Sequence, residues 1–408
     1  MNDEVVHKDL LNDLNITDGL RIGHLNVNGL KNKLSEISLL IHTARFDILA
    51  LSETHLTDET ADCEIDIDGY KIRRTDRDNG EKWGGTLLYY SENLIAHEVP
   101  SDIKSNTEST WIDFNIKNQR LLIGCVYRPP DDNKFITKFT KVLDMICHKR
   151  KNILLLGDFN YDFTDKPDAK YRSRHFKNLL YTYRLKNVID KPTRITDSTS
   201  TLIDLVITTS NPLGPKITTS GCYDPCISDH HLVYATLDLK RPKRTPKIIT
   251  TYKCENPEAL KDAFDKAPWH ILEIFDDVDD IHHCWYKLYT EITNDFVKSR
   301  KVKIRAHSKP WMNGAIRKEM NRRYKLLQKA RKTAKDSPDW KLYKVQRNKC
   351  TNMIRKAETE YWKDKFANSD TTKSFWKIVA EFQGKNITKK NGTLKDETTT
   401  NCIGWKYL

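Results

Sequence analysis

Hydrophobic residues in the first 240 positions form short runs that are rich in β-branched residues and separated by turn residues. This pattern is typical of strands, and amphipathic stretches between some of the runs are typical of helices, so we predict a mixed α/β domain. Runs such as IGCVY and ILLLG are apolar throughout, which predicts strands covered on both faces, as in a layered sandwich. The predicted strands are residues 20–26, 47–53, 85–90, 110–116, 120–127, 153–158, 203–208 and 232–239, and the predicted helices are residues 30–42, 134–148 and 171–183.

The pattern changes after Lys240. The segment RPKRTPKIITTYK combines proline and basic residues with little apolar material, so we place a domain boundary there. Apolar residues then recur at helical spacing, with Pro310 as a suitable first residue of one helix, a second helix at 340–366, and a third that ends before Gly384. The predicted division is a flexible N-terminus (1–17), an α/β domain (18–240), a linker with a partial helix (241–305), a basic helical region (306–385) and a disordered or truncated tail (386–408).

Charge is distributed unevenly along the chain. The formal net charge is +13, yet residues 1–240 carry 31 Lys and Arg against 35 Asp and Glu, whereas residues 241–408 carry 38 against 21. Within residues 301–365 the numbers are 21 and 6, which suits a polyanionic partner such as DNA or RNA. A solvated helical surface has the same composition and stays open as an alternative. Aromatic residues lie between the basic ones, as in base-stacking platforms, although packing between amphipathic helices also explains them.

The sequence contains no apolar run of about 18 residues and no basic-then-apolar start. We therefore expect neither a membrane span nor a signal peptide. The nine cysteines are an odd number and are scattered over a long chain, unlike the dense framework of a small secreted domain. Reduced thiols and an intracellular location are the expectation.

Polar side chains stand at the ends of several predicted strands, where a sandwich can gather them into one pocket. A single residue of this kind is most often a turn or helix cap. The same placement repeated along the domain favours a common site. These residues are Asn26, Asn28, Glu53, Asp158, Asn160, Asp204, Asp229 and His230.

Their types suit metal-assisted hydrolysis of a phosphodiester, which needs an activated water and a counter-charge for the phosphoryl oxygens. Mg²⁺, or Mn²⁺ in its place, prefers oxygen ligands and keeps several waters, so Glu53 and Asp229 together with the phosphate would suffice. Asp158 is the candidate that orients or deprotonates the water, and Asn160 would fix its geometry.

A histidine paired with an aspartate stays protonated more readily than a free one and can donate to a phosphoryl oxygen. His230 and Asp204 are the candidates for this pair. A Cys-x3-Cys-x3-His-His arrangement from Cys222 to His231 also leaves a zinc site open, although Cys-x2-Cys is the more usual spacing.

Six motifs in order, LNVNGL, LSETHL, VYRPP, LLLGDFN, STLIDLV and SDHH, resemble those of the endonuclease/exonuclease/phosphatase superfamily over about residues 18–240. The resemblance is strongest to the apurinic/apyrimidinic-type endonuclease domain of LINE-type (non-LTR) retrotransposons. It implies a four-layer α/β sandwich, with two β-sheets flanked by helices. It also implies a Mg²⁺-dependent DNA endonuclease that works in the nucleus, where its nick primes reverse transcription.

The resemblance further implies roles for individual residues. Glu53 would be the main metal ligand and Asp229 a second acid on the metal side. Asn26 and Asn160 would position phosphate and water, and Tyr127 of VYRPP would contact the phosphate. Asp158 would align the water beside the Asp204 and His230 pair. Asn28 stands where repair relatives carry an aspartate. The residues that resemble the retroelement branch after GDFN are Thr193, Arg194, Ser200 and Thr201.

The basic segments KPWMNGAIRKEMNRR and SFWKIVAEFQGK are similar to the helical connector that precedes a reverse transcriptase in such elements. No Tyr-x-Asp-Asp motif lies in a suitable setting, and FDDVDD at 275–280 is interpreted as a solvated acidic segment. We therefore expect no reverse transcriptase activity and a chain truncated before the polymerase. Two alternatives stay open, a catalytically silent retroelement remnant that binds nucleic acid and a phosphoesterase of the same fold that acts on a small phosphoester.

Overall fold

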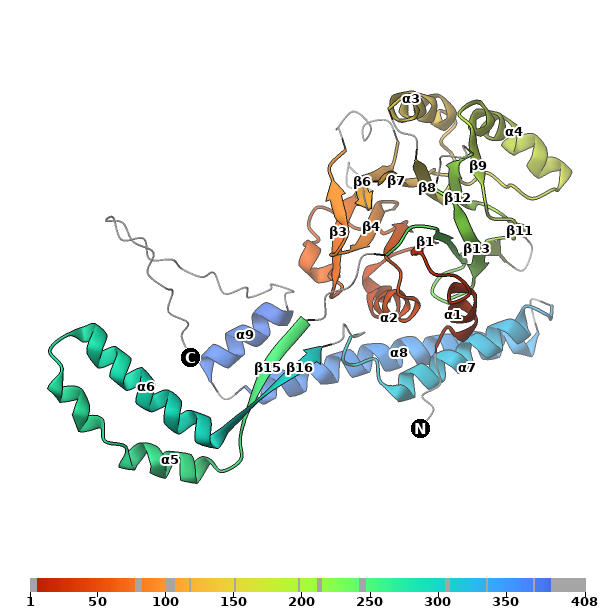
Figure 1. The fold of residues 1–408 in the computed structure, drawn as a ribbon. Helices are drawn as coiled ribbons and strands as arrows, with labels where there is room; N and C mark the ends of the chain where they lie inside the picture. The colour runs from red at the N-terminus through yellow and green to blue at the C-terminus, as the bar shows by residue number, and fades with distance from the viewer. Residues whose placement is uncertain are drawn as a thin grey trace. The chain divides into compact units, whose positions relative to one another are not determined.

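The computed structural model describes residues 6–77, 83–99, 107–116, 119–149, 152–196, 199–210, 215–241, 247–304, 309–334, 337–369 and 371–382. The chain divides into two compact units, which are described separately. Unit 1 comprises residues 1–242 and 307–408, and unit 2 comprises residues 243–306. Figure 1 shows the elements of both.

Two six-stranded sheets form the centre of unit 1 (Figure 1). The first has the order β13 (Ile217–Tyr223), β14 (Leu232–Leu237), β1 (Leu20–Asn26), β2 (Ile48–Ser52), β4 (Thr86–Ser91) and β3 (Tyr70–Thr75). The second has the order β5 (Ile95–His97), β6 (Ser109–Ile116), β7 (Gln119–Tyr127), β8 (Ile153–Asp158), β12 (Asp204–Thr209) and β9 (Leu185–Asn187). β1 pairs with β2 in parallel, as does β7 with β8, whereas β14 and β12 run antiparallel to β1 and β8. β10 (Arg194–Ile195) and β11 (Ser200–Thr201) pair antiparallel in a separate two-stranded sheet.

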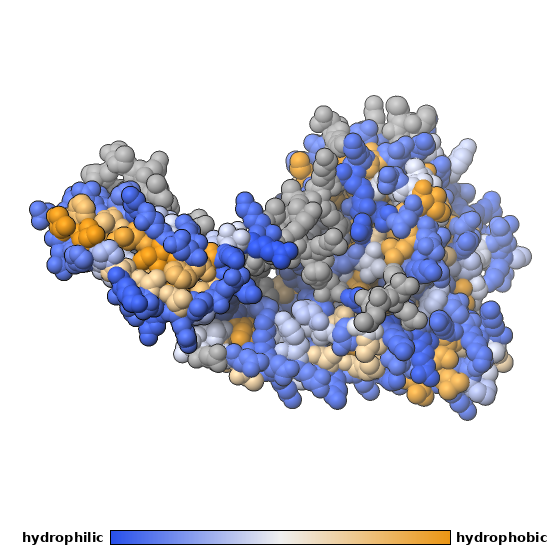
Figure 2. All heavy atoms as spheres, turned by 60° about the horizontal axis from the view of Figure 1, so that its bottom comes forward, coloured by the Kyte–Doolittle hydropathy of each residue, from blue (hydrophilic) through white to orange (hydrophobic). Residues whose placement is uncertain are grey.

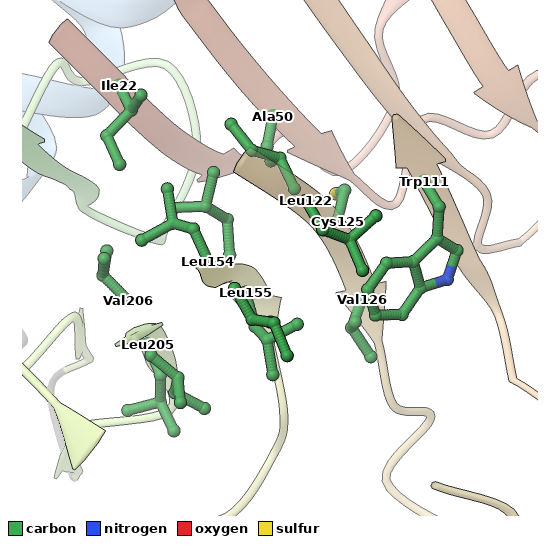
Figure 3. Packing of buried hydrophobic residues seen from close by; sticks show 14 of the residues in the cluster. Ile22, Ala50, Trp111, Leu122, Cys125, Val126, Leu154, Leu155, Leu205 and Val206 are labelled. Carbon is green, nitrogen blue, oxygen red and sulfur yellow. The ribbon is translucent and has the colours of Figure 1, made fainter. Parts of the chain in front are cut away.

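Helices cover the outer face of each sheet. α1 (Lys8–Leu14) and α2 (Leu34–Ala44) share an apolar core with the first sheet, and α3 (Phe135–Cys147) and α4 (Pro167–Thr182) pack against the second. The two sheets meet through apolar side chains that interdigitate between them (Figure 3). In this layer a side chain at Gly124 would lie 2.4 Å from the Trp111 indole, so glycine makes room for that ring. The four-layer α/β sandwich predicted from the sequence is confirmed.

Each of the eight predicted strands is present, but several edge strands are missing from the prediction. β13 has the sequence ITTSGCY, and its side chains are half-buried or exposed. Without a fully buried face, such a strand shows no alternation of apolar and polar residues. The short strands β5 and β9 offer too few residues for a periodic pattern.

The basic region forms three helices, α7 (Gly314–Ala330), α8 (Pro338–Ala367) and α9 (Thr372–Phe382). The prediction that Pro310 starts a helix is wrong, because α7 begins at Gly314 and Asn313 caps it by accepting a hydrogen bond from the Ile316 amide at 3.0 Å. An amide side chain satisfies a free N–H of the first turn, which proline cannot do. Gly384 and the predicted tail lie outside the described residues.

α7 and α8 are anchored to the sandwich. Trp311, just before α7, is buried and donates from Nε1 to Ser35 Oγ of α2 at 3.0 Å. Arg323 of α7 forms a buried ion pair with Glu36 of α2, in which Nη2 and Oε2 are 2.5 Å apart. These contacts surround a small apolar core made of Val6, Leu39, Trp311, Met312, Ile316, Met320 and Ile354. The helical pair is therefore part of unit 1.

The contact between Trp311 and Ser35 allows a direct test of this docking. Ser35→Ala leaves the buried indole N–H without an acceptor, and we expect the free energy of unfolding to fall by about 1–2 kcal/mol. In a Trp311→Phe background the same substitution should cost less than about 0.5 kcal/mol, because no donor remains to be satisfied. Urea denaturation of the four proteins of this cycle measures the coupling. Additive effects would contradict the docked arrangement.

Unit 2 contains three helical segments between two strands. β15 (Lys247–Cys254) pairs antiparallel with β16 (Val297–Ile304), and between them lie α5 (Pro257–Lys266), the 3₁₀ helix η4 (Trp269–Ile274) and α6 (Val278–Phe296). None of the residues of α5, η4 or α6 is buried, and Figure 2 shows apolar residues along this part of the surface. The linker prediction missed both strands, which have the sequences KIITTYKC and VKSRKVKI. Asp277 of FDDVDD caps α6 by accepting from the Asp279 amide at 2.7 Å.

No helix in the described part of the chain combines the length and apolarity that a membrane crossing requires.

Candidate active site

Four strand ends bring the candidate residues together at one edge of the sandwich. Asn26 is the last residue of β1, and Asp158 is the last residue of β8. β12 runs antiparallel to β8, and its first residue, Asp204, is paired in register with Asp158. His230 comes two residues before β14, the antiparallel neighbour of β1. The strand order thus places residues from both sheets side by side.

Three of these residues, Asp158, Asp204 and His230, are named here the acidic cluster. His230 Nδ1 lies 2.9 Å from Asp204 Oδ2 and 3.9 Å from Asp158 Oδ2. Asn26 links the two sheets by donating from Nδ2 to Asp158 Oδ2 at 2.9 Å. All four residues are at most 5% exposed. Within the described residues, this cluster is the group of acidic and histidine side chains whose ligand atoms all lie within 4.8 Å of one another.

A second layer of polar groups holds Asp204 in place. Thr193 Oγ1 donates to Asp204 Oδ2 at 2.7 Å and accepts from the Asp204 amide at 3.0 Å. His24 of β1 approaches the other oxygen, with Nδ1 3.7 Å from Asp204 Oδ1, while its Nε2 lies 3.0 Å from Ser52 Oγ. Burial lowers the pKa of His24 to about 4, against the opposing charge of Asp204. His24 is therefore neutral at physiological pH.

The three residues of the acidic cluster have pKa values that are shifted in different directions. Burial lowers the pKa of His230, but the ion pair with Asp204 and the charge of Asp158 outweigh burial and bring it to about 9. Burial raises the pKa of Asp158, and the neighbouring Asp204 charge raises it further. Burial would also raise the pKa of Asp204, yet His230 holds it below its usual value. The cluster thus contains a histidinium, an ionised partner and a second carboxyl that binds protons more tightly than usual.

Glu53 and Tyr127 lie next to each other beside the acidic cluster. Burial raises the pKa of the Tyr127 hydroxyl, and the charge of Glu53, its hydrogen bond to Glu53 and the charge of Asp158 add to this. The Glu53 carboxylate is 22% exposed and lies 3.9 Å from His55 Nε2. Glu53 has a φ of +50°, which is uncommon for a residue with a side chain. The constrained backbone fixes the carboxylate at the end of β2.

Asp229 takes part in a different contact from the other candidates. Its Oδ2 lies 2.9 Å from Nη2 and 3.0 Å from Nε of Arg194, and its side chain is 43% exposed. Burial would raise the pKa of Asp229, but His230 and Arg194 lower it. Arg194 reaches this position because it forms an isolated β-bridge with His230.

The ammonium group of Lys33 lies close enough to Glu53 and Asp229 to be influenced by both charges. Lys33 Nζ donates to the main-chain oxygens of Val27 and Asn28. Burial lowers the pKa of Lys33, and the charges of Asp229, Glu36 and Glu53 oppose that shift. Both carboxylates therefore influence the Lys33 ammonium, and carboxylate oxygens are the ligand type that Mg²⁺ prefers. Within the described residues, the group of three ligand atoms that all lie within 4.8 Å of one another is formed by Asp158, Asp204 and His230.

Asn160 makes contacts through its main chain and its side chain, and Asn28 makes contacts through its main chain. The Asn160 amide donates to Asp158 Oδ1 at 3.0 Å, while its side chain donates to the Arg128 main-chain oxygen at 2.8 Å. The Asn28 amide donates to Asn26 Oδ1 at 3.1 Å. Both residues have positive φ angles, 48° and 44°. Asparagine tolerates this conformation better than most residues, which explains its presence at these two turns.

A family model matches the part of the chain that carries this site. Residues 23–230, about half of the chain, match the model of the endonuclease/exonuclease/phosphatase family. The chain belongs to this family. Residues 312–371, which include α7 and α8, are similar to the C-terminal domain of female sterile protein K10. No curated protein matches the chain.

Solved structures of the endonuclease/exonuclease/phosphatase fold resemble part of this chain. The endonuclease domain of TRAS1, a telomere-specific non-LTR retrotransposon, is 15% identical, and the match covers 54% of this chain and 100% of that one (TM-score 0.44). The AP endonuclease LMAP from Leishmania major is 13% identical, with 58% and 96% covered (TM-score 0.47). The 3′-5′ exonuclease NExo from Neisseria meningitidis is 17% identical, with 54% and 100% covered (TM-score 0.44).

The prediction from strand ends does not include His24, which lies inside β1 and approaches Asp204. It lies two positions before Asn26 on β1, so both side chains point to the same face of the strand. That spacing was a usable signal. The zinc alternative is not supported within the described residues, because Cys222 and Cys226 are not part of any group with metal-binding spacing. Cys222 Sγ instead contacts the Pro192 main-chain oxygen at 3.8 Å.

Proposed function

We propose that this member of the endonuclease/exonuclease/phosphatase family is a Mg²⁺-dependent DNA endonuclease that hydrolyses one phosphodiester and nicks its target. The observation that carries the proposal is the acidic cluster. In it the carboxyl of Asp158, whose pKa is raised, lies 3.9 Å from Nδ1 of the protonated His230. Groups whose environments push their proton affinities apart are suited to be the base and the acid of one reaction. The motif order over residues 18–240 supports a non-LTR retrotransposon setting, in which the nick primes reverse transcription.

Asp158 is the proposed acceptor of the proton from the attacking water. Its two oxygens accept from Asn26 Nδ2 and from the Asn160 amide, which fixes the plane of the carboxylate. A base held in one orientation can align the water with the phosphorus. Its raised pKa increases its proton affinity near neutral pH, which strengthens it as a base.

His230 is the proposed donor to the phosphoryl oxygen. Asp204 holds its Nδ1, so Nε2 and its proton remain for the substrate. A fixed positive charge in a buried site stabilises the negative charge that develops on the phosphoryl group. Thr193 and His24 act through Asp204, and we assign them to positioning. Tyr127 is the proposed contact for a phosphate oxygen.

Glu53 and Asp229 are the residues that would hold the metal ion, for which Mn²⁺ is an alternative to Mg²⁺. When bound, the ion supplies positive charge to the phosphate oxygens and lowers the barrier to attack. To bind the ion, the Asp229 carboxylate would have to leave its ion pair with Arg194. Arg194 would then be free to contact a DNA phosphate, as arginine does in many such interfaces.

A plasmid assay tests the proposal against both alternatives. The full chain is incubated with supercoiled plasmid, with bis-p-nitrophenyl phosphate and with a soluble inositol phosphate, each in Mg²⁺ and in EDTA. We expect open circles from the plasmid in Mg²⁺ alone. Turnover of a small phosphoester with intact supercoils would contradict the DNA substrate. A folded protein without any turnover would favour the silent remnant.

A further inference from the structure

The outward face of α8 carries a row of polar residues at regular helical spacing. The positions follow one another at intervals of three or four residues, so they lie along one line of the helix. All of them are exposed, whereas Gln346, Cys350 and Ile354 on the opposite face are buried. The row consists of Lys341, Lys344, Asn348, Asn352, Arg355, Thr359 and Lys363.

Several other basic residues of the region are already paired with carboxylates. Arg323 and Arg331 are used in docking, because they pair with Glu36 and Asp224 of the sandwich at 2.5 and 2.7 Å. Lys329 and Lys349 pair with Asp339 and Glu319 within the helical pair. In contrast, Lys341, Lys344, Arg355 and Lys363, named here the cationic row, have no carboxylate partner within the described part of the chain.

No position of the row holds an acidic residue. Four cations in one line therefore create a positive field that α8 does not neutralise. The asparagine and threonine residues between them offer neutral hydrogen-bond groups of the kind that contact phosphate and sugar oxygens. This combination suits a polyanion whose charges are repeated along a line.

The length of the row fits duplex DNA. From Lys341 to Lys363 the helix rises about 33 Å, because each residue adds about 1.5 Å. One turn of B-DNA spans about 34 Å and carries one negative charge per about 1.7 Å of its axis. A rigid helix of this length therefore spans about one turn of a duplex.

An anionic membrane is the competing polyanionic surface. A helix that binds a membrane surface inserts an apolar face between the headgroups. On α8 most of the apolar residues are packed, since Ile354 lies in the core with Trp311 and Met320, and Met353 and Tyr361 pack against it. The large apolar side chains that α8 leaves exposed, Leu342 and Val345, do not form such a face. The face that carries α7 and α8 is largely hydrophilic (Figure 2).

We propose that the cationic row of α8 is a docking surface for the phosphate backbone of duplex DNA, separate from the acidic cluster. The choice of DNA as the partner rests on the proposed function, whereas the polyanion-binding character rests on the row alone. The surface adds affinity that depends on salt and not on sequence. It holds the substrate while the acidic cluster performs the hydrolysis.

The test measures DNA binding by fluorescence anisotropy in EDTA, with the full chain and a labelled duplex of about 30 base pairs, or about three turns. The row variant carries Lys341→Gln, Lys344→Gln, Arg355→Gln and Lys363→Gln. The control variant removes four exposed cations from the region of α3 and α4 by Lys141→Gln, Lys149→Gln, Arg172→Gln and Arg174→Gln. Both lose the same charge, so they differ only in where the charge is lost.

For the row variant we expect the slope of log K against log salt to become shallower by about 3, and the affinity at moderate salt to fall at least about tenfold. The control variant should change the slope by less than about 1. Equal effects of the two variants, or an unchanged slope in the row variant, would overturn the proposal. A row variant that loses binding to phosphatidylserine vesicles but keeps its DNA affinity would also overturn it.

Two double variants guard against a folding defect. One carries Lys341→Gln and Lys344→Gln, and the other carries Arg355→Gln and Lys363→Gln. Each should give about half of the slope change with an unaltered circular dichroism spectrum. Because binding is measured without a metal ion, the result is independent of the chemistry. A chain that does not nick DNA but shows the expected slopes would refute the proposed function and leave this inference intact.

Discussion

Replacing Asp158 by asparagine should lower the nicking rate by about two orders of magnitude or more, which is the usual range for the loss of a general base. The amide keeps the size of the side chain and can still accept from Asn26 Nδ2 or from the Asn160 amide. It cannot accept a proton from water. The rate of open-circle formation under single-turnover conditions measures this effect, and a rate within about tenfold of the wild type would contradict the role of Asp158.

The same substitution should change the stability of the protein only modestly. The folded state raises the pKa of Asp158 because the carboxyl is buried next to Asp204. For an acid with a raised pKa in the folded state, folding is disfavoured once the pH rises above the ordinary pKa of the unfolded chain. The neutral amide avoids this cost, but its NH2 group faces one of the two donors, Asn26 Nδ2 or the Asn160 amide, and a buried donor without an acceptor costs about 1–3 kcal/mol. The two effects oppose each other, so the melting temperature near neutral pH should change only by a few degrees. Asp165→Asn is the matched control, since its carboxylate is 97% exposed, and it should change neither property.

Replacing His230 by glutamine should lower activity by about two orders of magnitude at pH 7 and also destabilise the protein. The variant removes the positive charge that lies 2.9 Å from Asp204 and 3.9 Å from Asp158. Two buried carboxyls then face each other without a cation, and a broken buried pair costs about 3 kcal/mol. Urea denaturation measures this loss. A second variant, His230→Gln with Asp204→Asn, should recover most of the stability and none of the activity.

The pH dependence gives this prediction a second readout. The folded state raises the pKa of His230 to about 9 from an ordinary value of 6.5. Its contribution to stability is therefore fully present below about pH 6.5 and is lost as the pH rises through about 9. Wild-type stability and nicking should both decline along this limb, whereas the glutamine variant should lack it. A wild-type rate that stays constant up to pH 10 would contradict the protonated role.

The sequence was sufficient to predict the sandwich and the meeting of its strand ends, because the central strands are continuous apolar runs that end in polar residues. β1 and β8 match their predicted limits at both ends. These two strands lie in different sheets, and their last residues, Asn26 and Asp158, are hydrogen-bonded to each other. The pattern therefore predicted a neighbourhood even though the residues are 132 positions apart.

Other features depend on tertiary contacts that a linear pattern does not contain. The partner of Asp229 is Arg194, which is brought in by a single β-bridge to His230. The charge pattern alone treats Arg323 as one of many basic residues on a solvated surface. It lies three residues after Met320 and four before Leu327, on the apolar face of α7. That spacing predicts burial, but only the presence of Glu36 on α2 makes the burial of an arginine tolerable.

Metal-dependent nicking that requires Glu53 tests the central claim most directly. Supercoiled plasmid is incubated with the wild type and with Glu53→Gln, in Mg²⁺ and in EDTA, after circular dichroism has shown that both proteins are folded. We predict open circles only from the wild type with Mg²⁺, with a loss of at least about two orders of magnitude in the variant. Intact supercoils with the wild type, or equal nicking by Glu53→Gln, would contradict the assignment of this chain as a metal-dependent endonuclease.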